Sequence, residues 1–527
     1  MTKKILLSAA AAMFLSLVVS PAQEKIRQVV SSDYNRNSIS VVAVERGDSY
    51  DSQVRNAVNG LNLGEKYDIN KIPTKAVRLS KYRSESSTQE EIDALVASKS
   101  FGTEILGSIF NRDSRGMMDD KTVRYRGNYD AKDQDVINAR ASRVGVDALG
   151  DLGHKLVSNS YIVLFDYFKI DRYTDRNGKT TWSTNAKAYA YRIGMSPERL
   201  NDFYEQCWIY EEDDQATRDS KINAFRNFAI DMEPVATVSN SGAGSDVQAA
   251  AASCLGALIN SLENRISDWE VAVTILSKHP LQAKIGTKEG LGNGDRYRAY
   301  SYREDKNGNL VSVKRGYLRA TEIASNTGMA LGDTEPSKFY QVSGIANIDE
   351  GWTIKQSNDY KIGAMLGLKV GGINKTTLAV DMDYLVNLKT SGSASYVLFG
   401  FGLDVGKTGD YACFNLGLGY GYGLHFTRFF EFMPYATVGM DHISLSNTDS
   451  DDNRFLRSSA LVLEPGVKAA LNVAYPLQVY AKVCYDLLIY GQTVNDIYYR
   501  YNQALATYYD NEHHSGLGIQ FGVKWTF

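Results

Sequence analysis

The sequence is poor in cysteine and has no excess of basic residues. Four Cys in 527 residues are too few for a disulfide-stapled scaffold, although one pair could be bridged in an oxidising compartment. The 58 Lys and Arg against 61 Asp and Glu give a net charge of −3, so no global positive field recruits nucleic acid. With 43% hydrophobic residues, the chain is long and apolar enough for two or three folded domains, and disorder is excluded.

Signatures of catalysis and metal binding are also missing. The six His form no His-Glu-x-x-His pattern, and the chain has neither a Cys-x-x-Cys pair nor a Gly-x-Ser-x-Gly elbow. We therefore expect no catalytic, cofactor-binding or metal-binding residues, no cofactor and no enzymatic activity. Cys207 and Cys254 fall in predicted helices, where they are either buried thiols or a bridge.

The first 22 residues read as a secretory signal peptide. Lys3 and Lys4 precede an apolar run over 5–19, and Ser20-Pro21-Ala22 places small residues before a cleavage site. The apolar run is shorter than the roughly 20 residues of a membrane-spanning helix. We expect an exported mature chain.

The last twelve residues alternate strictly between apolar and small or polar side chains. Leu517, Ile519, Phe521, Val523, Trp525 and Phe527 share one face of the predicted strand. Six large apolar side chains facing water would cause aggregation, so they must face protein or lipid. The run from Leu477 to Ile489 repeats the pattern, with charged residues on its other face.

Eight such segments recur along the last third of the chain. They lie near 359–370, 375–388, 395–405, 410–424, 431–445, 458–473, 477–491 and 515–527. Their lengths match the roughly 9–11 residues with which a tilted strand crosses a bilayer. A tight turn at Tyr475-Pro476 contrasts with long polar connections at 447–457 and 493–514. We predict a closed antiparallel transmembrane barrel.

The inward positions of this barrel carry charges of both signs. The expected inward cations are Lys361, Lys369, Lys468, Lys482 and Lys524, and the anions are Asp381, Asp383, Asp404, Asp441, Glu464 and Asp486. Because eight strands enclose a lumen about filled by side chains, these charges are expected to pair and plug it. Inward Gly residues make room for them, and Cys413 and Cys484 act as small lumen fillers. A small-solute channel is the alternative.

With these features, residues 359–527 resemble the eight-stranded outer-membrane barrels of the OmpA and OmpX type. The terminal Trp525-Thr526-Phe527 resembles the signal by which the barrel-insertion machinery recognises that family, through Phe527. The resemblance implies a Gram-negative outer membrane and contact with its lipid. Pro434 and Pro465 depart from the pattern, so we expect bulges or strand ends there. Some barrels of this size are enzymes with loop-borne His and Ser, so Asp510, His513 and His514 are candidates for a hydrolase or acyltransferase site.

The N-terminal two thirds alternate between helical and strand patterns. Strands are expected at 38–45, 160–171, 180–192, 234–239 and 270–276, and helices at 48–61, 88–98, 133–156, 197–207, 216–230 and 247–266. We predict an α/β or α+β domain over 23–278, a small β-rich module over 279–350 and the barrel over 351–527. The stretch 141–167, with Gly145, Gly150 and Gly153 before a strand, has a faint resemblance to CsgG-like periplasmic domains, although the lipidated Cys of that family is missing.

Together these patterns predict an outer-membrane protein. An even strand number places both ends of the barrel on the same side of the membrane, so the N-terminal region is expected in the periplasm and the long loops outside. We expect the barrel to anchor a periplasmic domain that binds or scaffolds a protein or another envelope component, whose identity the sequence does not give.

Overall fold

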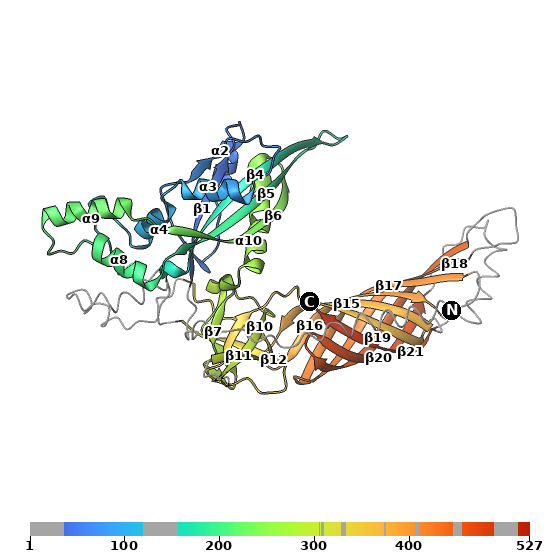
Figure 1. The fold of residues 1–527 in the computed structure, drawn as a ribbon. Helices are drawn as coiled ribbons and strands as arrows, with labels where there is room; N and C mark the ends of the chain where they lie inside the picture. Colours follow the sequence, from blue (N-terminus) through green and yellow to red (C-terminus); the bar gives the residue numbers. More distant parts are fainter. Residues whose placement is uncertain are drawn as a thin grey trace.

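A computed structural model describes residues 36–119, 156–304, 306, 310–327, 334–373, 376–405, 411–445, 456–489 and 515–527. In these residues the chain forms, in order, a six-stranded mixed sheet, a seven-stranded antiparallel sheet and a closed barrel of eight strands. Figure 1 shows the seven-stranded sheet between the other two parts. The predicted signal peptide and nearly all of the predicted helix at 133–156 lie outside the described residues.

The first part is an α/β domain, as predicted. Its strands are β1 (Asn37–Glu45), β2 (Tyr67–Ile69), β3 (Ala76–Arg78), β4 (Ser160–Thr174), β5 (Thr180–Gly194) and β6 (Asp231–Gly244). Its helices are α2 (Asp51–Asn59), α3 (Gln89–Ala97), α4 (Phe101–Ile109), α8 (Pro197–Cys207), α9 (Gln215–Asn227) and α10 (Val247–Arg265). The sheet order is β2-β1-β4-β5-β6, with β3 also paired to β1. The predicted hairpin is confirmed as β4 and β5.

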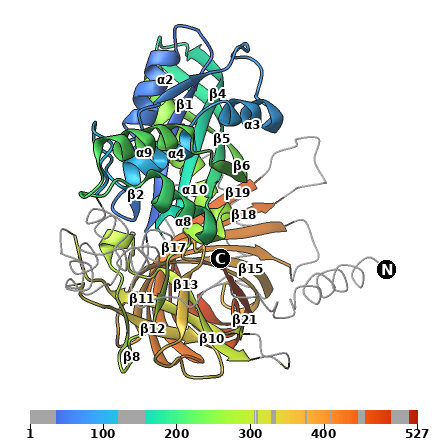
Figure 2. The same cartoon turned by 60° about the vertical axis from the view of Figure 1, so that its left-hand side comes forward.

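Alternation along the strands builds a separate apolar core on each face of this sheet. Tyr161, Val163 and Phe165 of β4 pack with α2 and α10, whereas Ile162 and Leu164 pack with α3, α4, α8 and α9. The sheet is therefore the middle of three layers, with helices on both sides (Figure 2). None of the helices in the described residues combines the length and the apolar composition needed to cross a membrane.

Local signals start most of these helices where the sequence predicts them. Thr88 and Glu91 form a capping box at α3, and Ser196 caps α8 just before Pro197. Helix α4 was not predicted, because Gly102 and Gly107 lower its helix propensity. Tertiary packing stabilises it instead, since a Cβ at Gly102 would lie 2.6 Å from the Cβ of Ile230.

The four cysteines are free and buried. Cys207 belongs to the core on one face of the sheet and Cys254 to the core on the other. A bridge between them is therefore excluded, which leaves the buried-thiol alternative. Burial raises the pKa of each of these two thiols to about 11, so both are protonated and poorly reactive at neutral pH.

A buried ion pair crosses the centre of the α/β domain. The Arg46 guanidinium, just after β1, donates to both carboxylate oxygens of Asp166 on β4, at 2.6 and 2.9 Å, and both side chains are fully buried. Ser87 donates to the same carboxylate through its hydroxyl and, at 3.3 Å, its backbone N–H. The Tyr189 hydroxyl on β5 donates to the Ser87 carbonyl at 2.8 Å. The pair thus joins β1, β4, β5 and the start of α3.

Removal of one member of this pair is expected to open the α/β domain locally. Asp166→Asn leaves Arg46 buried without its counter-ion, at a cost of about 3–5 kcal/mol. Hydrogen exchange on the full chain in detergent should show lower protection of β1 and β4 with an unchanged barrel. Asp171→Asn is the matched control on the same strand, because its ion pair with Lys169 is half exposed and worth less than about 1 kcal/mol. Equal loss of protection in both variants would contradict this role.

The second part is a small antiparallel module. Its strands are β7 (Ala272–Thr274), β8 (Ser277–Lys278), β9 (Leu281–Ala283), β10 (Arg296–Glu304), β11 (Leu310–Glu322), β12 (Ser337–Ser343) and β13 (Thr353–Gln356), and two 3₁₀ turns cover Ser267–Trp269 and Thr287–Glu289. The sheet order is β7-β13-β10-β11-β12-β9-β8. This sheet extends beyond the predicted module limits of 279 and 350, since β7 and β13 lie outside them and pair with each other.

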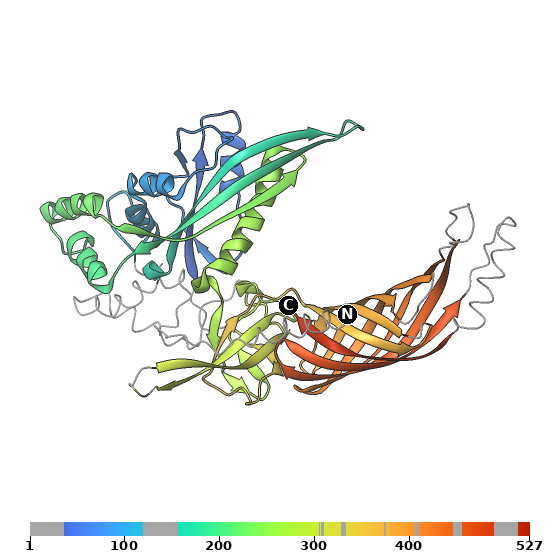
Figure 3. The same cartoon turned by 45° about the vertical axis from the view of Figure 1, so that its right-hand side comes forward.

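The third part is the predicted barrel of eight antiparallel strands. They are β14 (Ile362–Gly371), β15 (Thr376–Leu388), β16 (Ser393–Asp404), β17 (Tyr411–Thr427), β18 (Phe430–Leu445), β19 (Leu456–Ala474), β20 (Leu477–Ile489) and β21 (Gly516–Thr526). Strand β14 pairs with β21 and closes the barrel. The backbone N–H of Tyr360 donates to the Phe527 carbonyl, so both ends of the barrel lie on one side, next to the module (Figure 3).

The two prolines do not end or bulge their strands, so that expectation was wrong. Pro434 and Pro465 lie inside β18 and β19, whose mutual pairing runs through both without a shift. Each proline instead interrupts the ladder on its other side: the β17–β18 pairing skips from Tyr435 to Phe432, and the β19–β20 pairing skips from Leu463 to Gly466, both in unchanged register. A proline lacks only one N–H, and one continuous ladder per strand keeps the register.

Candidate functional site

The outer wall of the barrel is apolar and exposed. Leu418 on β17 is 59% exposed and Phe521 on β21 is 61% exposed, and many large apolar side chains on every strand of the wall share this orientation. Along β18, the outward positions from Phe430 to Met440 are all apolar, and His442 follows. Eleven residues is the length with which a tilted strand crosses the hydrocarbon of a bilayer. The wall therefore faces lipid, and the barrel spans a membrane.

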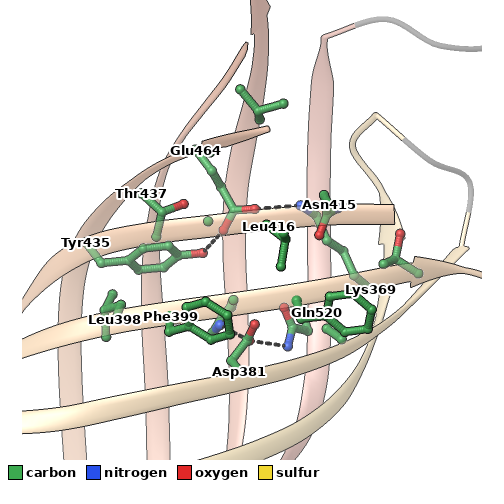
Figure 4. Close-up of a pocket in the computed structure, with 18 of the residues that line it drawn as sticks. Lys369, Asp381, Leu398, Phe399, Asn415, Leu416, Tyr435, Thr437, Glu464 and Gln520 are labelled. Atoms are coloured by element: carbon green, nitrogen blue, oxygen red, sulfur yellow. Dashed lines mark hydrogen bonds and ion pairs between the residues drawn. The ribbon is translucent and has the colours of Figure 1, made fainter. Parts of the chain in front are cut away.

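The inner wall carries ion pairs that join strands that are not neighbours in the barrel. Lys369 on β14 donates to both carboxylate oxygens of Asp486 on β20, at 2.7 Å each, and to Glu464 on β19 at 2.8 Å. The Tyr435 hydroxyl on β18 donates to the other Glu464 oxygen at 2.8 Å. Figure 4 shows Glu464 between Lys369 and Tyr435, with Asp381 and Gln520 facing each other nearby. Four strands are thus linked across the lumen.

Two further clusters continue the network along the barrel axis. Lys482 pairs with Asp381, which also accepts from the Gln520 amide at 3.0 Å. Closer to the end of the barrel that holds Phe527, Asp383 accepts from Lys524 at 2.6 Å. It also lies 3.5 Å from the fully buried Lys468, which is 3.6 Å from Glu431. Opposite charges therefore follow one another along the lumen.

The space left in the lumen is small. One cavity of about 70 Å³ lies among Lys369, Asp381 and Glu464, and another of about 50 Å³ lies among Asp383, Tyr396 and other residues near the inner end. Cavities of this size hold a few water molecules. The described part of the lumen is therefore plugged by its own side chains, as the charge pattern predicts.

The inward glycines provide the room for these long side chains. A Cβ at Gly421 would lie 2.7 Å from the Met433 sulfur, and one at Gly367 would lie 2.9 Å from the Gln520 amide nitrogen. Side chains at these positions would displace members of the network. The inward glycine pattern is therefore a packing requirement of a narrow barrel, as the sequence suggests.

The sequence placed most of the inward charges correctly, with one error and one omission. Lys361 does not enter the lumen, because its positive φ of 59° breaks the strand alternation just before β14 begins. Glu431 was missed, although it is buried and lies beside Lys468. The alternation of β18 already marks it as inward, since Glu431 shares the parity of Tyr435 and Asp441.

One group of side chains has a metal-like arrangement. Potential ligand atoms of Glu464, Cys484 and Asp486 lie within 4.8 Å of one another. The Lys369 ammonium already contacts both carboxylates, so it supplies the positive charge that these groups need. The arrangement is therefore that of the Lys369 ammonium paired with the carboxylates of Glu464 and Asp486.

The module covers the inner mouth of the barrel, the end at which the first barrel strand begins and the last one ends. Arg319 on β11 donates to Asp359, which precedes β14, and to the Gly294 carbonyl at 2.5 Å. Arg296 on β10 bonds the Tyr475 hydroxyl in the β19–β20 turn, and the rings of Tyr317 and Tyr475 stack at 3.8 Å. Burial opposes the charge of Arg319, but Asp359 outweighs it and raises the pKa of the guanidinium above its usual value.

The module also binds a second inner turn, between β15 and β16, and Lys361, the residue just before the first barrel strand. The side chain of Asn293 both donates to and accepts from the Leu388 backbone at 2.8 Å, and the hydroxyls of Thr321 and Thr390 lie 2.9 Å apart. Lys361 reaches the module instead of the lumen. Its ammonium lies 2.9 Å from Asp295 and donates to the Asn293 carbonyl at 2.6 Å.

The third turn, between β17 and β18, has its own contacts with the module. Arg428 bonds Asn347 and the Ile345 carbonyl, the latter at 2.6 Å. Asn472 on the neighbouring strand donates to the Val342 carbonyl at 2.9 Å. Each of the three inner turns of the barrel is therefore bonded to the module.

The described histidines are scattered. His279 is exposed in the module, the ring of His425 bonds the Gly392 carbonyl at the inner mouth, and His442 bonds Ser459 on the outer wall. The loop-borne candidates Asp510, His513 and His514 lie outside the described residues.

A scan against protein-family models found no match, and a search of curated proteins found none either. Solved structures do match over the barrel. The N-terminal β-barrel domain of Pseudomonas aeruginosa OprF is 13% identical, covers 32% of this chain and 96% of its own, and has a TM-score of 0.21. Neisserial surface protein A is 12% identical over 32% of this chain and 94% of its own, with a TM-score of 0.22. A major outer membrane protein from Thermus thermophilus is 17% identical over 32% of this chain and all of its own, with a TM-score of 0.21.

The matched region is the barrel. The closed barrel of eight strands in this structure agrees with the resemblance drawn from the sequence. Its length, its apolar wall and its paired lumen charges are those of an outer-membrane barrel with eight strands.

The docking of the module can be tested by a disulfide across the inner mouth. Thr321→Cys with Thr390→Cys should oxidise readily, because the two hydroxyls lie 2.9 Å apart, and mass spectrometry of non-reduced peptides would detect the bond. The pair Tyr82→Cys with Thr390→Cys should not cross-link. Adding Arg319→Ala should slow cross-linking of the first pair at least several-fold. A module that moves freely would give similar yields for both pairs.

Proposed function

We propose that this protein is an outer-membrane anchor that holds its α/β domain in the periplasm, where the domain binds an envelope component. The barrel supplies the attachment, the module supplies a fixed joint, and the α/β domain supplies the binding surface. The proposed role is non-enzymatic and needs no cofactor.

The observation that carries the proposal is the double closure of the barrel. Ion pairs such as Lys369 with Asp486 fill the lumen, and the module bonds all three inner turns. Side chains that fill the described part of the lumen in this way leave a solute little room, so a small-solute channel is the weaker candidate. What remains for the barrel is to position the part of the chain attached to its inner mouth.

The topology supports a periplasmic position for the α/β domain. Both ends of the barrel lie next to the module, and the turns on that side are short, for example Tyr475-Pro476. In outer-membrane barrels, the short turns face the periplasm and the longer loops face outward. The α/β domain, which precedes the module in the chain, is therefore proposed to lie on the periplasmic side.

A protease-site experiment tests this orientation. A specific protease sequence is inserted into the exposed β4–β5 turn at Asn177-Gly178, and in the control chain into the predicted outward loop 493–514. Protease added to intact cells should cut the control but spare the β4–β5 site until the outer membrane is permeabilised. In planar bilayers, the purified full chain should give no single-channel steps. Cleavage of the β4–β5 site in intact cells, or steady conductance, would refute the anchor.

A photo-crosslinking experiment tests the binding role. Tyr82 is 81% exposed and Tyr173 is 68% exposed on the α/β domain, so a photoreactive amino acid at each position should capture a non-lipid envelope component in living cells. The same amino acid at Leu418 on the lipid-facing wall should yield lipid adducts only. If a scan of exposed α/β positions captures no more than the Leu418 control does, the domain is not a binding module.

A further inference from the structure

The depth of the inner turns in the membrane follows from strand β18. Its outward positions are apolar from Phe430 to Met440, a length that fills the hydrocarbon. The preceding turn at Arg428 and Phe429 therefore lies at the level of the inner-leaflet headgroups. Leu471 and Val473, at the inner end of β19, are 50% and 64% exposed on the same side of the wall, which fits this depth.

A loop of the module is fixed to this turn. The Arg428 guanidinium bonds the Ile345 carbonyl and the Asn347 side chain, and it lies 4.8 Å from the centre of the Phe429 ring. The Asn472 amide donates to the carbonyls of both Val342 and Arg428. Residues 342–347 are thus held at the same depth as the turn.

The side chain that this loop presents is apolar. Ile345 is 91% exposed, the largest exposed fraction of any large hydrophobic residue in the described part of the chain. Phe426 and Phe429 of the adjacent β17–β18 hairpin are 67% and 41% exposed. A single exposed Ile is unremarkable on a soluble surface, but this one is bonded to a turn at the edge of a lipid-facing wall.

We propose that residues 344–347 of the module insert Ile345 into the inner-leaflet interface of the outer membrane, as a second lipid contact beside the barrel. We expect lipid to contact Ile345, because the loop that carries it is hydrogen-bonded to Arg428 and Asn472 at the inner edge of the lipid-facing wall. Arg428 suits this position, since its guanidinium lies over the Phe429 ring, and arginine and aromatic side chains are favoured at the membrane–water interface. This inference does not depend on what the α/β domain binds.

The contact can be measured by depth-dependent fluorescence quenching. The natural cysteines of the described chain are buried, so Ile345→Cys can be labelled selectively with a polarity-sensitive fluorophore in the full chain. The protein is reconstituted into phosphatidylcholine and phosphatidylglycerol vesicles that carry a spin label near the headgroup end of the acyl chain. Position 345 should be quenched at least half as strongly as Val473→Cys on the barrel wall, whereas Tyr82→Cys on the α/β domain should not be quenched.

Two outcomes would overturn the inference. Quenching at position 345 that equals the Tyr82→Cys value, with normal quenching at Val473→Cys, places the loop in water. The second outcome concerns an added substitution, Arg428→Ala. It should lower quenching at position 345 at least two-fold and leave quenching at Val473→Cys unchanged. Unchanged quenching at position 345 in this variant refutes the claim that Arg428 holds the loop at the membrane. The Val473→Cys signal reports in each case that the barrel is folded and inserted.

Discussion

A closed sheet of eight strands leaves almost no space along its axis, and this constraint governs the whole molecule. Each charged inward side chain must find its partner within the lumen, because an unpaired buried charge costs several kcal/mol. Lys369 with Asp486 and Lys524 with Asp383 meet this requirement by joining strands that are far apart in the sequence. The apolar wall follows from the same alternation, since a strand with one face in a polar lumen has its other face in lipid.

The plugged lumen changes what the barrel can contribute. The ionic network fills the barrel and makes it rigid. A rigid barrel can hold whatever is bonded to its inner turns in a fixed position. The inner mouth has such bonds at each turn, from Tyr475 through Thr390 to Arg428. Gly392 shows how close the approach is, because a Cβ there would lie 2.9 Å from the ring of Tyr340 in the module. The seven-stranded sheet is therefore packed directly against the inner mouth of the barrel.

The sequence predicted the barrel well and its joint poorly, for a physical reason. Each barrel strand lies between two fixed environments, so alternation alone gives every strand to within three residues. The contacts between the module and the barrel join residues that are far apart in the sequence, and no local sequence pattern indicates which residues meet. Asp359 was read as the start of the first barrel strand, yet it binds Arg319 of the module. Lys361 had the parity of a lumen residue, but a left-handed backbone turns it towards Asp295. Helix α4 was missed for a related reason, since Gly102 is explained only by its contact with Ile230.

The same comparison separates the two kinds of buried charge in this chain. Arg46 and Asp166 lie in the α/β domain, where each guanidinium nitrogen and both carboxylate oxygens have a hydrogen-bond partner within the protein, so their contribution is to the fold. The charges at the inner mouth are placed where two folded parts meet, and there Arg319 and Arg428 differ. Arg319 is sealed between the module and the barrel, whereas Arg428 bonds the module from the rim of the lipid-facing wall. Arg319 thus holds the module to the barrel inside their interface, and Arg428 holds it at the edge of the lipid-facing wall.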